Sequence, residues 1–134
     1  MTPRHFLRFS DLTAGEVDTI LKRSAVLKAT RRTHEKRLAG KSIALFFEKP
    51  STRTRVSFEV GIYEVGAHPV VISPRDSQVG RGETVADTAR TLSRYVDALV
   101  VRTFEQARIE ELARHATVPV VNALTDLHHP CQVL

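Results

Sequence analysis

The chain has 134 residues, of which 42% are hydrophobic and 26% charged, and its formal net charge is +5. This composition is typical of one globular domain and excludes a disordered or fibrous protein. No apolar run reaches the roughly 20 residues that a membrane-spanning helix needs, so we expect no membrane partner. A single cysteine and an N-terminus without an apolar signal segment indicate a cytoplasmic protein.

The positive charge is compatible with two classes of partner. A basic surface could bind nucleic acid, whereas basic groups that converge on one point could bind a small anion. The densest basic cluster, residues 28–37, also contains Glu35, and neither zinc-finger spacing nor arginine–aromatic repeats accompany it. We interpret this cluster as a solvated surface and expect no nucleic acid partner.

Hydrophobic periodicity predicts alternating helices and strands along the chain. The first element is an amphipathic helix within residues 11–30, and Thr13 with Glu16 fits a capping box at its start. Short apolar runs predict strands at 41–48, 68–73, 98–102 and 118–123. Helical patterns lie at 51–66, 82–95 and 104–116. Gly66 is a typical helix stop, because glycine tolerates the left-handed conformation that ends many helices.

Strands that alternate with helices of about a dozen residues are typical of βαβ units and a parallel sheet. The predicted strands are almost continuously apolar, as expected when helices cover both faces of a sheet. We therefore predict an α/β fold: a three-layer sandwich with an open parallel sheet of about four strands flanked by helices. In such sheets the ligand binds beyond the carboxyl ends of the strands.

Polar side chains follow each of the predicted strands. They are concentrated in residues 50–55, 73–78, 102–103 and 122–132. Because the carboxyl ends of parallel strands meet at one edge of the sheet, we expect hydroxyls, guanidinium groups, imidazoles and amides to collect there. The sequence thus predicts a cationic mouth on an apolar body.

The first of these segments lies where a strand turns into a helix. It reads Ser51, Thr52, Arg53, Thr54 and Arg55. A helix that begins here leaves its first backbone N–H groups unpaired, and its dipole adds partial positive charge. The hydroxyls and a guanidinium fork complete a predicted phosphate cradle, although an ordinary N-cap with exposed arginines is the alternative. The glycine-rich pattern of ATP-binding loops is absent, so ATP is not implied.

Four ordered motifs, "FEKPSTRTRVSFE", "SQVGRGET", "DALVVRTF" and "HPCQVL", resemble those of the carbamoyltransferase family. The second and fourth resemble its ornithine branch, and the whole chain resembles the amino-terminal, carbamoyl phosphate-binding domain. The resemblance implies transfer of the carbamoyl group from carbamoyl phosphate to the side-chain amine of L-ornithine, giving L-citrulline and phosphate, without a cofactor. The family's second domain has no counterpart in the sequence. We therefore expect residues 1–134 to form the carbamoyl phosphate-binding domain and the ornithine-binding domain to be absent.

The resemblance also assigns the residues that hold carbamoyl phosphate. They are Ser51, Thr52, Arg53, Thr54, Gln78, Arg102, His129, Pro130, Cys131 and Gln132. Among them, Arg53, Arg102 and His129 are the implied catalytic residues, because they offset charge on the leaving phosphate and on the carbonyl oxygen. The family often has a cis peptide bond before the proline of this motif, and we expect one before Pro130.

Gln78 has a separate implied role. In the family, the loop that carries it reaches into the site of the neighbouring subunit, which implies a homotrimer built through this domain. Two other side chains are given structural interpretations: Arg55 is expected to pair with Glu59 at i,i+4, and the thiol of Cys131 to be packed and unreactive. The histidines away from the strand ends form no cluster, so we expect no metal site.

Three alternatives stay open on the sequence alone. Within the family, the chain could belong to an aspartate or an acetylornithine carbamoyltransferase, because the second substrate is selected by the other domain. From a different class, it could be a non-catalytic module that binds anions or nucleic acid. Binding to DNA that weakens with salt, without any response to carbamoyl phosphate, would favour the last alternative.

Overall fold

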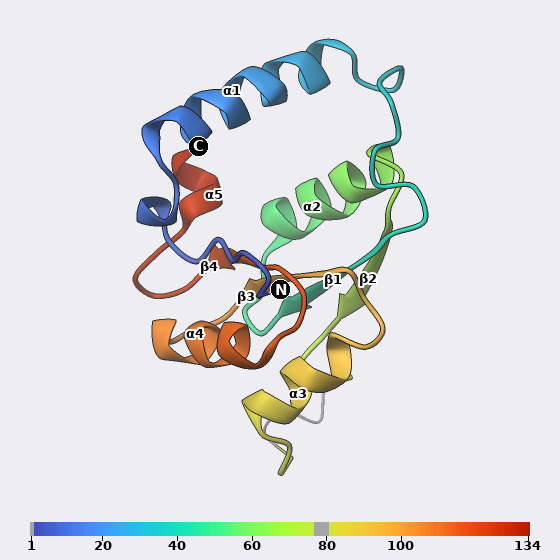
Figure 1. Cartoon of the computed structure of the whole chain (residues 1–134). Coiled ribbons are helices and arrows are strands. Elements are labelled where there is room, and N and C mark those ends of the chain that lie inside the picture. The colour runs from blue at the N-terminus through green and yellow to red at the C-terminus, as the bar shows by residue number, and fades with distance from the viewer. Residues whose placement is uncertain (1, 77–80) are drawn as a thin grey trace.

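Four parallel strands with helices on both faces form the framework of the protein in the computed structural model, which describes residues 2–76 and 81–134 (Figure 1). The strands are β1 (Ser42–Phe47), β2 (His68–Ile72), β3 (Ala98–Arg102) and β4 (Val120–Leu124). Their order in the sheet is β2-β1-β3-β4, and all neighbouring pairs are parallel. The predicted α/β sandwich is therefore confirmed, and each predicted strand lies within two residues of the observed one.

The helices follow the predicted pattern. They are α1 (Ala14–Ala29), α2 (Thr52–Glu64), α3 (Val85–Leu92), α4 (Gln106–His115) and the short α5 (Pro130–Val133), with a 3-10 turn η1 (Phe9–Asp11) before α1. The predicted stop at Gly66 is confirmed: its φ is +94°, and an added Cβ would lie 2.8 Å from Lys36 Cβ. No helix in the described part of the chain is long and apolar enough to cross a membrane.

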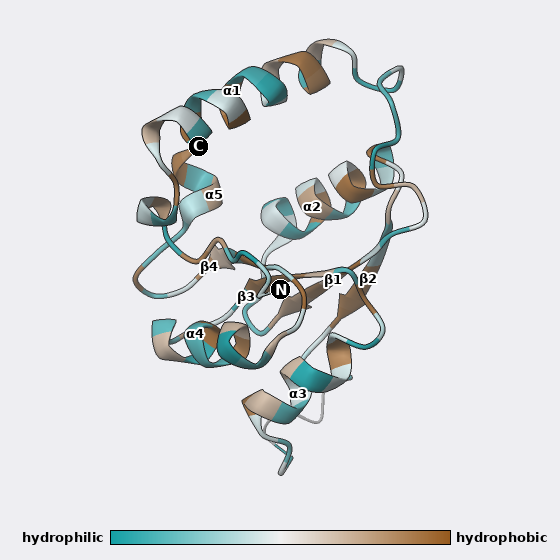
Figure 2. Cartoon of the chain, viewed as in Figure 1, coloured by the Kyte–Doolittle hydropathy of each residue, from teal (hydrophilic) through white to brown (hydrophobic). Residues whose placement is uncertain are grey.

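Side chains of alternate residues in the central strands pack into two separate hydrophobic cores, one on each face of the sheet. Ala44 and Phe46 of β1 pack on one face with Ala89 of α3 and Ile109 of α4. Leu45 and Phe47 point to the opposite face and pack with Ile62 of α2. Figure 2 shows hydrophobic strands between helices of mixed character. The period of two along a doubly covered strand thus produces the three layers.

Helix α1 forms where it was predicted but does not join either core. It contains no buried residue, and the side chains of Leu21 and Val26 are 46% and 53% exposed. Figure 1 places α1 beyond α2 and α5, which separate it from the sheet. The helical periodicity of residues 11–30 therefore predicted the element correctly, while its apolar side has no sheet to cover.

The N-terminal segment lies along the outer edge of β4. The Phe6 N–H donates to the carbonyl of Val120, and the Asn122 N–H donates to the carbonyl of Phe6, both at 2.8 Å. His5 Nδ1 accepts from the Val120 N–H at 3.1 Å. One of the two outer strands is therefore held by residues from the opposite end of the chain.

Candidate functional site

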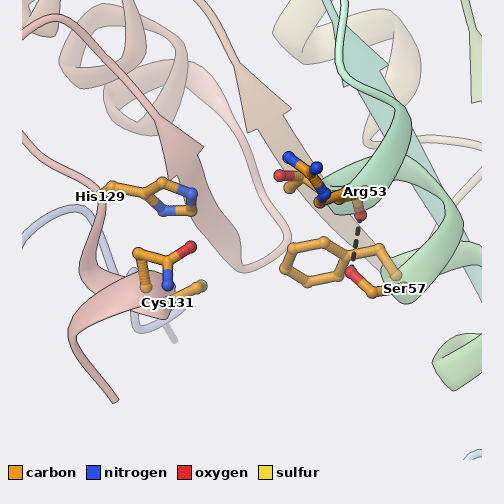
Figure 3. Close-up of a pocket in the computed structure, with 7 residues that line it drawn as sticks. Arg53, Ser57, His129 and Cys131 are labelled. Atoms are coloured by element: carbon orange, nitrogen blue, oxygen red, sulfur yellow. Dashed lines mark hydrogen bonds between the residues drawn. The ribbon is translucent and has the colours of Figure 1, made fainter.

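A cavity of about 390 Å³ lies between α2 and the start of α5, beyond the strands that lead into them. Its lining residues are Arg53, Thr54, Ser57, Phe58, His129, Cys131 and Gln132. Figure 3 shows Arg53 and Ser57 on one wall and His129 and Cys131 on the wall that faces it. Five of the predicted site residues, separated by more than seventy positions in the sequence, are thus brought around one cavity.

The cavity meets helix α2 at its N-terminus. The N-cap residue Ser51 has an extended backbone, its side chain caps no N–H group, and the first turn contains no acidic residue. An uncapped helix start presents N–H donors and the positive end of the helix dipole, which together suit an anion. Ser51 and Thr52 line an adjoining cavity of about 600 Å³ on the β2 side of the same helix start. The local features predicted for a phosphate cradle are therefore present.

Arg102, the last residue of β3, approaches the same helix turn. Its Nη1 lies 3.5 Å from Thr54 Oγ1, which is the limit of a hydrogen bond. Its Nε is buried and has no hydrogen-bond partner among the described residues. A buried donor without a partner is costly, so this N–H group suits an oxyanion bound against the same helix turn, although Arg102 is not among the residues that line the cavity.

His129 faces the cavity from the residue before α5. Its Nδ1 is buried without a hydrogen-bond partner in the described part of the structure. Burial, and then the positive charge of Arg102, lowers the pKa of His129 below its usual value. The imidazole is therefore neutral at physiological pH and carries one N–H group that can donate to a ligand.

A buried polar network shapes the loop that carries His129. Thr125 Oγ1 donates to Gln106 Oε1 at 2.7 Å and accepts from the His128 N–H at 3.1 Å. Asn122, which is fully buried, accepts from the Leu124 N–H at 2.9 Å through its Oδ1 and donates to the carbonyl of Leu7 at 2.8 Å through its Nδ2. The sequence named Asn122 only as a polar residue at a strand end, and its contacts were not predicted.

A β-bulge accompanies this network. Val101 pairs with Asn122, but Arg102 pairs with Leu124, so that one extra residue stands in β4. Bulges near sites redirect the side chains that follow them. This bulge lies near the end of β4, ahead of the loop that presents His129, and no sequence pattern predicted it.

Three predicted site residues remain to be placed: Cys131, Pro130 and Gln78. Cys131 donates its thiol to the Asn122 carbonyl at 3.4 Å, and burial raises its pKa to about 11, in agreement with a packed and unreactive thiol. Pro130 is buried at the first position of α5, and the described residues contain no cis peptide bond, so the expected cis bond before it is wrong. Proline in the trans form suits the first position of a helix. Gln78 lies outside the described residues.

Arg55 differs from its neighbour Arg53. It pairs with Glu59 at 3.5 Å, which confirms its predicted structural role. Arg53 makes no ion pair within the described residues and lines the cavity. Among these residues no group of three or more metal-binding side chains comes together.

Comparisons with known proteins agree with this arrangement. The family described as "Aspartate/ornithine carbamoyltransferase, carbamoyl-P binding domain" matches residues 4–134. Ornithine carbamoyltransferase from Parafrankia sp. (strain EAN1pec) is 57% identical over 137 residues, covering 100% of this chain and 43% of that protein. The chain therefore spans less than half the length of this curated relative.

Solved structures give the same result. Ornithine carbamoyltransferase from Pyrococcus furiosus has a TM-score of 0.92 at 47% identity, over 98% of this chain and 42% of that chain. N-acetyl-L-ornithine transcarbamylase has a TM-score of 0.83 at 38% identity, over 96% and 44%. From its sequence and its fold, the chain belongs to the aspartate/ornithine carbamoyltransferase family, as a carbamoyl-P binding domain.

Proposed function

We propose that the cavity beside α2 binds carbamoyl phosphate for the reaction of an ornithine carbamoyltransferase. The observation that carries this proposal is that Arg53, Thr54 and His129 line one cavity at the open start of α2, while Arg102 lies 3.5 Å from Thr54. Arg102 has a buried N–H donor, and His129 a buried ring nitrogen, without a partner in the described structure. A dianionic phosphate with a neighbouring carbonyl oxygen has the acceptors that these donors lack.

The proposal gives each of these residues a role. The N–H groups and hydroxyls at the start of α2, with Arg53, would hold the phosphate and stabilise its charge as it leaves. Arg102 would reach both the phosphate and the carbonyl oxygen, and neutral His129 would donate to that oxygen. The side-chain amine of L-ornithine attacks the carbonyl carbon, the bond from that carbon to the phosphate oxygen breaks, and one amine proton is released. Fixed donors aimed at the developing charge are the main source of acceleration in such a reaction.

The second substrate and the assembly belong to the same proposal. L-ornithine would bind to a domain outside residues 1–134, in keeping with a match to 43% of the Parafrankia relative. Ornithine is favoured over N-acetylornithine because the curated relatives from Parafrankia sp. and Acidothermus cellulolyticus, each 57% identical, are both ornithine carbamoyltransferases. The shared site in a homotrimer, the role of Gln78 and the cytoplasmic location stay predictions. Sedimentation of the chain with and without Gln78→Ala tests the trimer.

Calorimetric titration of carbamoyl phosphate into the chain and two variants tests the proposed site. Arg53→Ala is expected to weaken binding by about 2–4 kcal/mol, or about 30- to 700-fold, because it removes a charge-assisted contact. Arg55→Ala is the matched control, since it removes an arginine of the same helix turn that is already paired with Glu59. Equal affinities for the three proteins, or no binding by the unmodified chain, would contradict the proposal.

A further inference from the structure

The segment that connects β1 to α2, residues 48–51, is called the cradle loop here because it leads directly into the uncapped helix start. Its first two residues, Glu48 and Lys49, are charged, and neither was given a role by the sequence. Both side chains find their partners in other elements, and those partners lie next to Arg102 and on the loop before His129. The cradle loop is therefore connected to the other two parts of the site.

Glu48 is held by four hydrogen bonds. Its carboxylate accepts from Arg108 Nε at 2.7 Å and from Arg108 Nη2 at 2.9 Å, which is a two-pronged contact with a guanidinium fork. The same carboxylate accepts from Thr103 Oγ1 at 2.8 Å, and Thr103 is fully buried. Its backbone N–H donates to the carbonyl of Arg102 at 2.8 Å. Glu48 thus fixes the cradle loop against β3 at the residues Arg102 and Thr103.

Lys49 makes a second connection in a different direction. Its Nζ lies 2.5 Å from Asp126 Oδ1 and 4.8 Å from the centre of the Phe104 ring. Asp126 belongs to the loop that leads to His129, and its N–H donates to the carbonyl of Phe104 at 2.7 Å. Consecutive residues of the cradle loop therefore connect the α2 start to the segments that carry Arg102 and His129.

We propose that Glu48 and Arg108 are positioning residues that set the distance between the α2 start and Arg102. This inference rests on the proposed function of the cavity. Neither side chain lines that cavity. Glu48 does line the adjoining cavity with Ser51 and Thr52, but its carboxylate is engaged by Arg108 and Thr103, so both residues act through the residues that they hold. The side chain of Glu48 is 15% exposed, and the fork contact joins residues 60 positions apart, so the pair holds two distant segments in one geometry.

The geometry predicts a selective effect on ligands. Carbamoyl phosphate must contact the α2 start and Arg102 at once, whereas inorganic phosphate can be held by the α2 start alone. A change in the distance between the α2 start and Arg102 therefore lowers the affinity for carbamoyl phosphate more than the affinity for inorganic phosphate. A pair that only stabilises the fold would lower the melting temperature and leave the ratio of the two affinities unchanged.

The experiment measures the affinity for carbamoyl phosphate and for inorganic phosphate well below the melting temperature, in three variants. Glu48→Gln and Arg108→Lys are each expected to weaken carbamoyl phosphate about tenfold and inorganic phosphate less than about threefold. Arg108→Lys keeps the charge but loses the planar fork, and it supplies the test if Glu48→Gln does not fold. Glu64→Gln is the matched control: its carboxylate is 20% exposed and paired with Arg31 at the far end of α2.

Each outcome bears on one proposal. Selective loss in both Glu48→Gln and Arg108→Lys, with an unchanged ratio in Glu64→Gln, supports positioning by Glu48 and Arg108. An unchanged ratio in all variants, while Arg53→Ala still loses binding, overturns the positioning role and leaves the proposed function intact. Absence of carbamoyl phosphate binding by the unmodified chain overturns both.

Discussion

The first turns of α1 and α2 are built on opposite plans. At the start of α1, Thr13 accepts from the Glu16 N–H, and Glu16 accepts from the Thr13 N–H in return. Arg4 pairs with the same carboxylate. At the start of α2, the side chain of Ser51 caps nothing, no acid stands in the first turn, and Arg53 is there instead.

If the proposed function holds, this difference separates a helix start that serves stability from one that serves binding. A capping box and an acid near the N-terminus each contribute stability, typically about 0.5–2 kcal/mol for the cap. Helix α2 forgoes both and places a positive charge at the positive end of its dipole. The N–H groups that α1 satisfies internally stay available at α2 for an external anion. The comparison predicts that the two starts respond oppositely to substitution.

Closing the α2 start by charge reversal gives the largest expected effect. Arg53→Glu should weaken carbamoyl phosphate by at least about 2–4 kcal/mol, because a carboxylate then occupies the place of the ligand's partner. The same change should raise the free energy of unfolding by about 0.3–1 kcal/mol, since an acid now stands at the positive end of the dipole. Calorimetry and urea unfolding measure the two quantities. If Arg53→Glu both weakened binding and lowered the free energy of unfolding, the idea that the α2 start gives up stability in exchange for binding would be wrong.

Removal of the N-cap of α1 should lower stability and leave ligand binding unchanged. Thr13→Ala removes the cap and is expected to lower the free energy of unfolding by about 1 kcal/mol. Its affinity for carbamoyl phosphate should stay within about twofold of the unmodified chain, because Thr13 is not among the residues that line the cavity. Urea unfolding and calorimetry on the same preparation check both values. A marked loss of affinity would mean that α1 supports the site from a distance.

On acidification, the stability contributed by His129 and that contributed by Glu16 at the α1 start should be lost in different pH ranges. The folded pKa of His129 is lowered by burial and by Arg102 from 6.5, so the unfolded chain binds more protons and stability falls as the pH drops below about 6.5. Hydrogen bonds from Arg4 and Thr13 lower the pKa of Glu16 from 4.5 to about 2, so its contribution is full above about 4.5 and is lost between those values. Both losses occur on acidification, but in different windows.

Two variants isolate these windows in urea unfolding at a series of pH values. His129→Gln should flatten the decline of stability that begins near pH 6.5, and Glu16→Gln should flatten only the decline below about pH 4.5. His5 also has a lowered pKa because of burial, so some decline near the upper window is expected to persist in His129→Gln. The assignment fails if His129→Gln leaves the upper window unchanged.

The sequence predicted what local patterns encode. The four strands follow from apolar runs, and the open start of α2 follows from the order Ser51, Thr52, Arg53. The side of α1 that carries Leu21 and Val26 was predicted as a stripe, but periodicity does not say which element covers it. The contacts of Glu48 with Arg108, and of Thr125 with Gln106, join residues 60 and 19 positions apart. Such pairings are set by the packing of α4 against the strand ends, which no single stretch of sequence records.

The strand order has a consequence for how the site comes into existence. The loops after β1, β3 and β4 become neighbours only when these three strands stand side by side, and β4 is also clasped by Phe6. A chain that has collapsed without docking its last strand has no complete place for the ligand. Ligand occupancy is therefore coupled to the pairing of β1, β3 and β4, and the free energy of binding is added to that of folding through mass action. Phe6 thereby stabilises the strand that leads to His129, Cys131 and Gln132, which form one wall of the cavity.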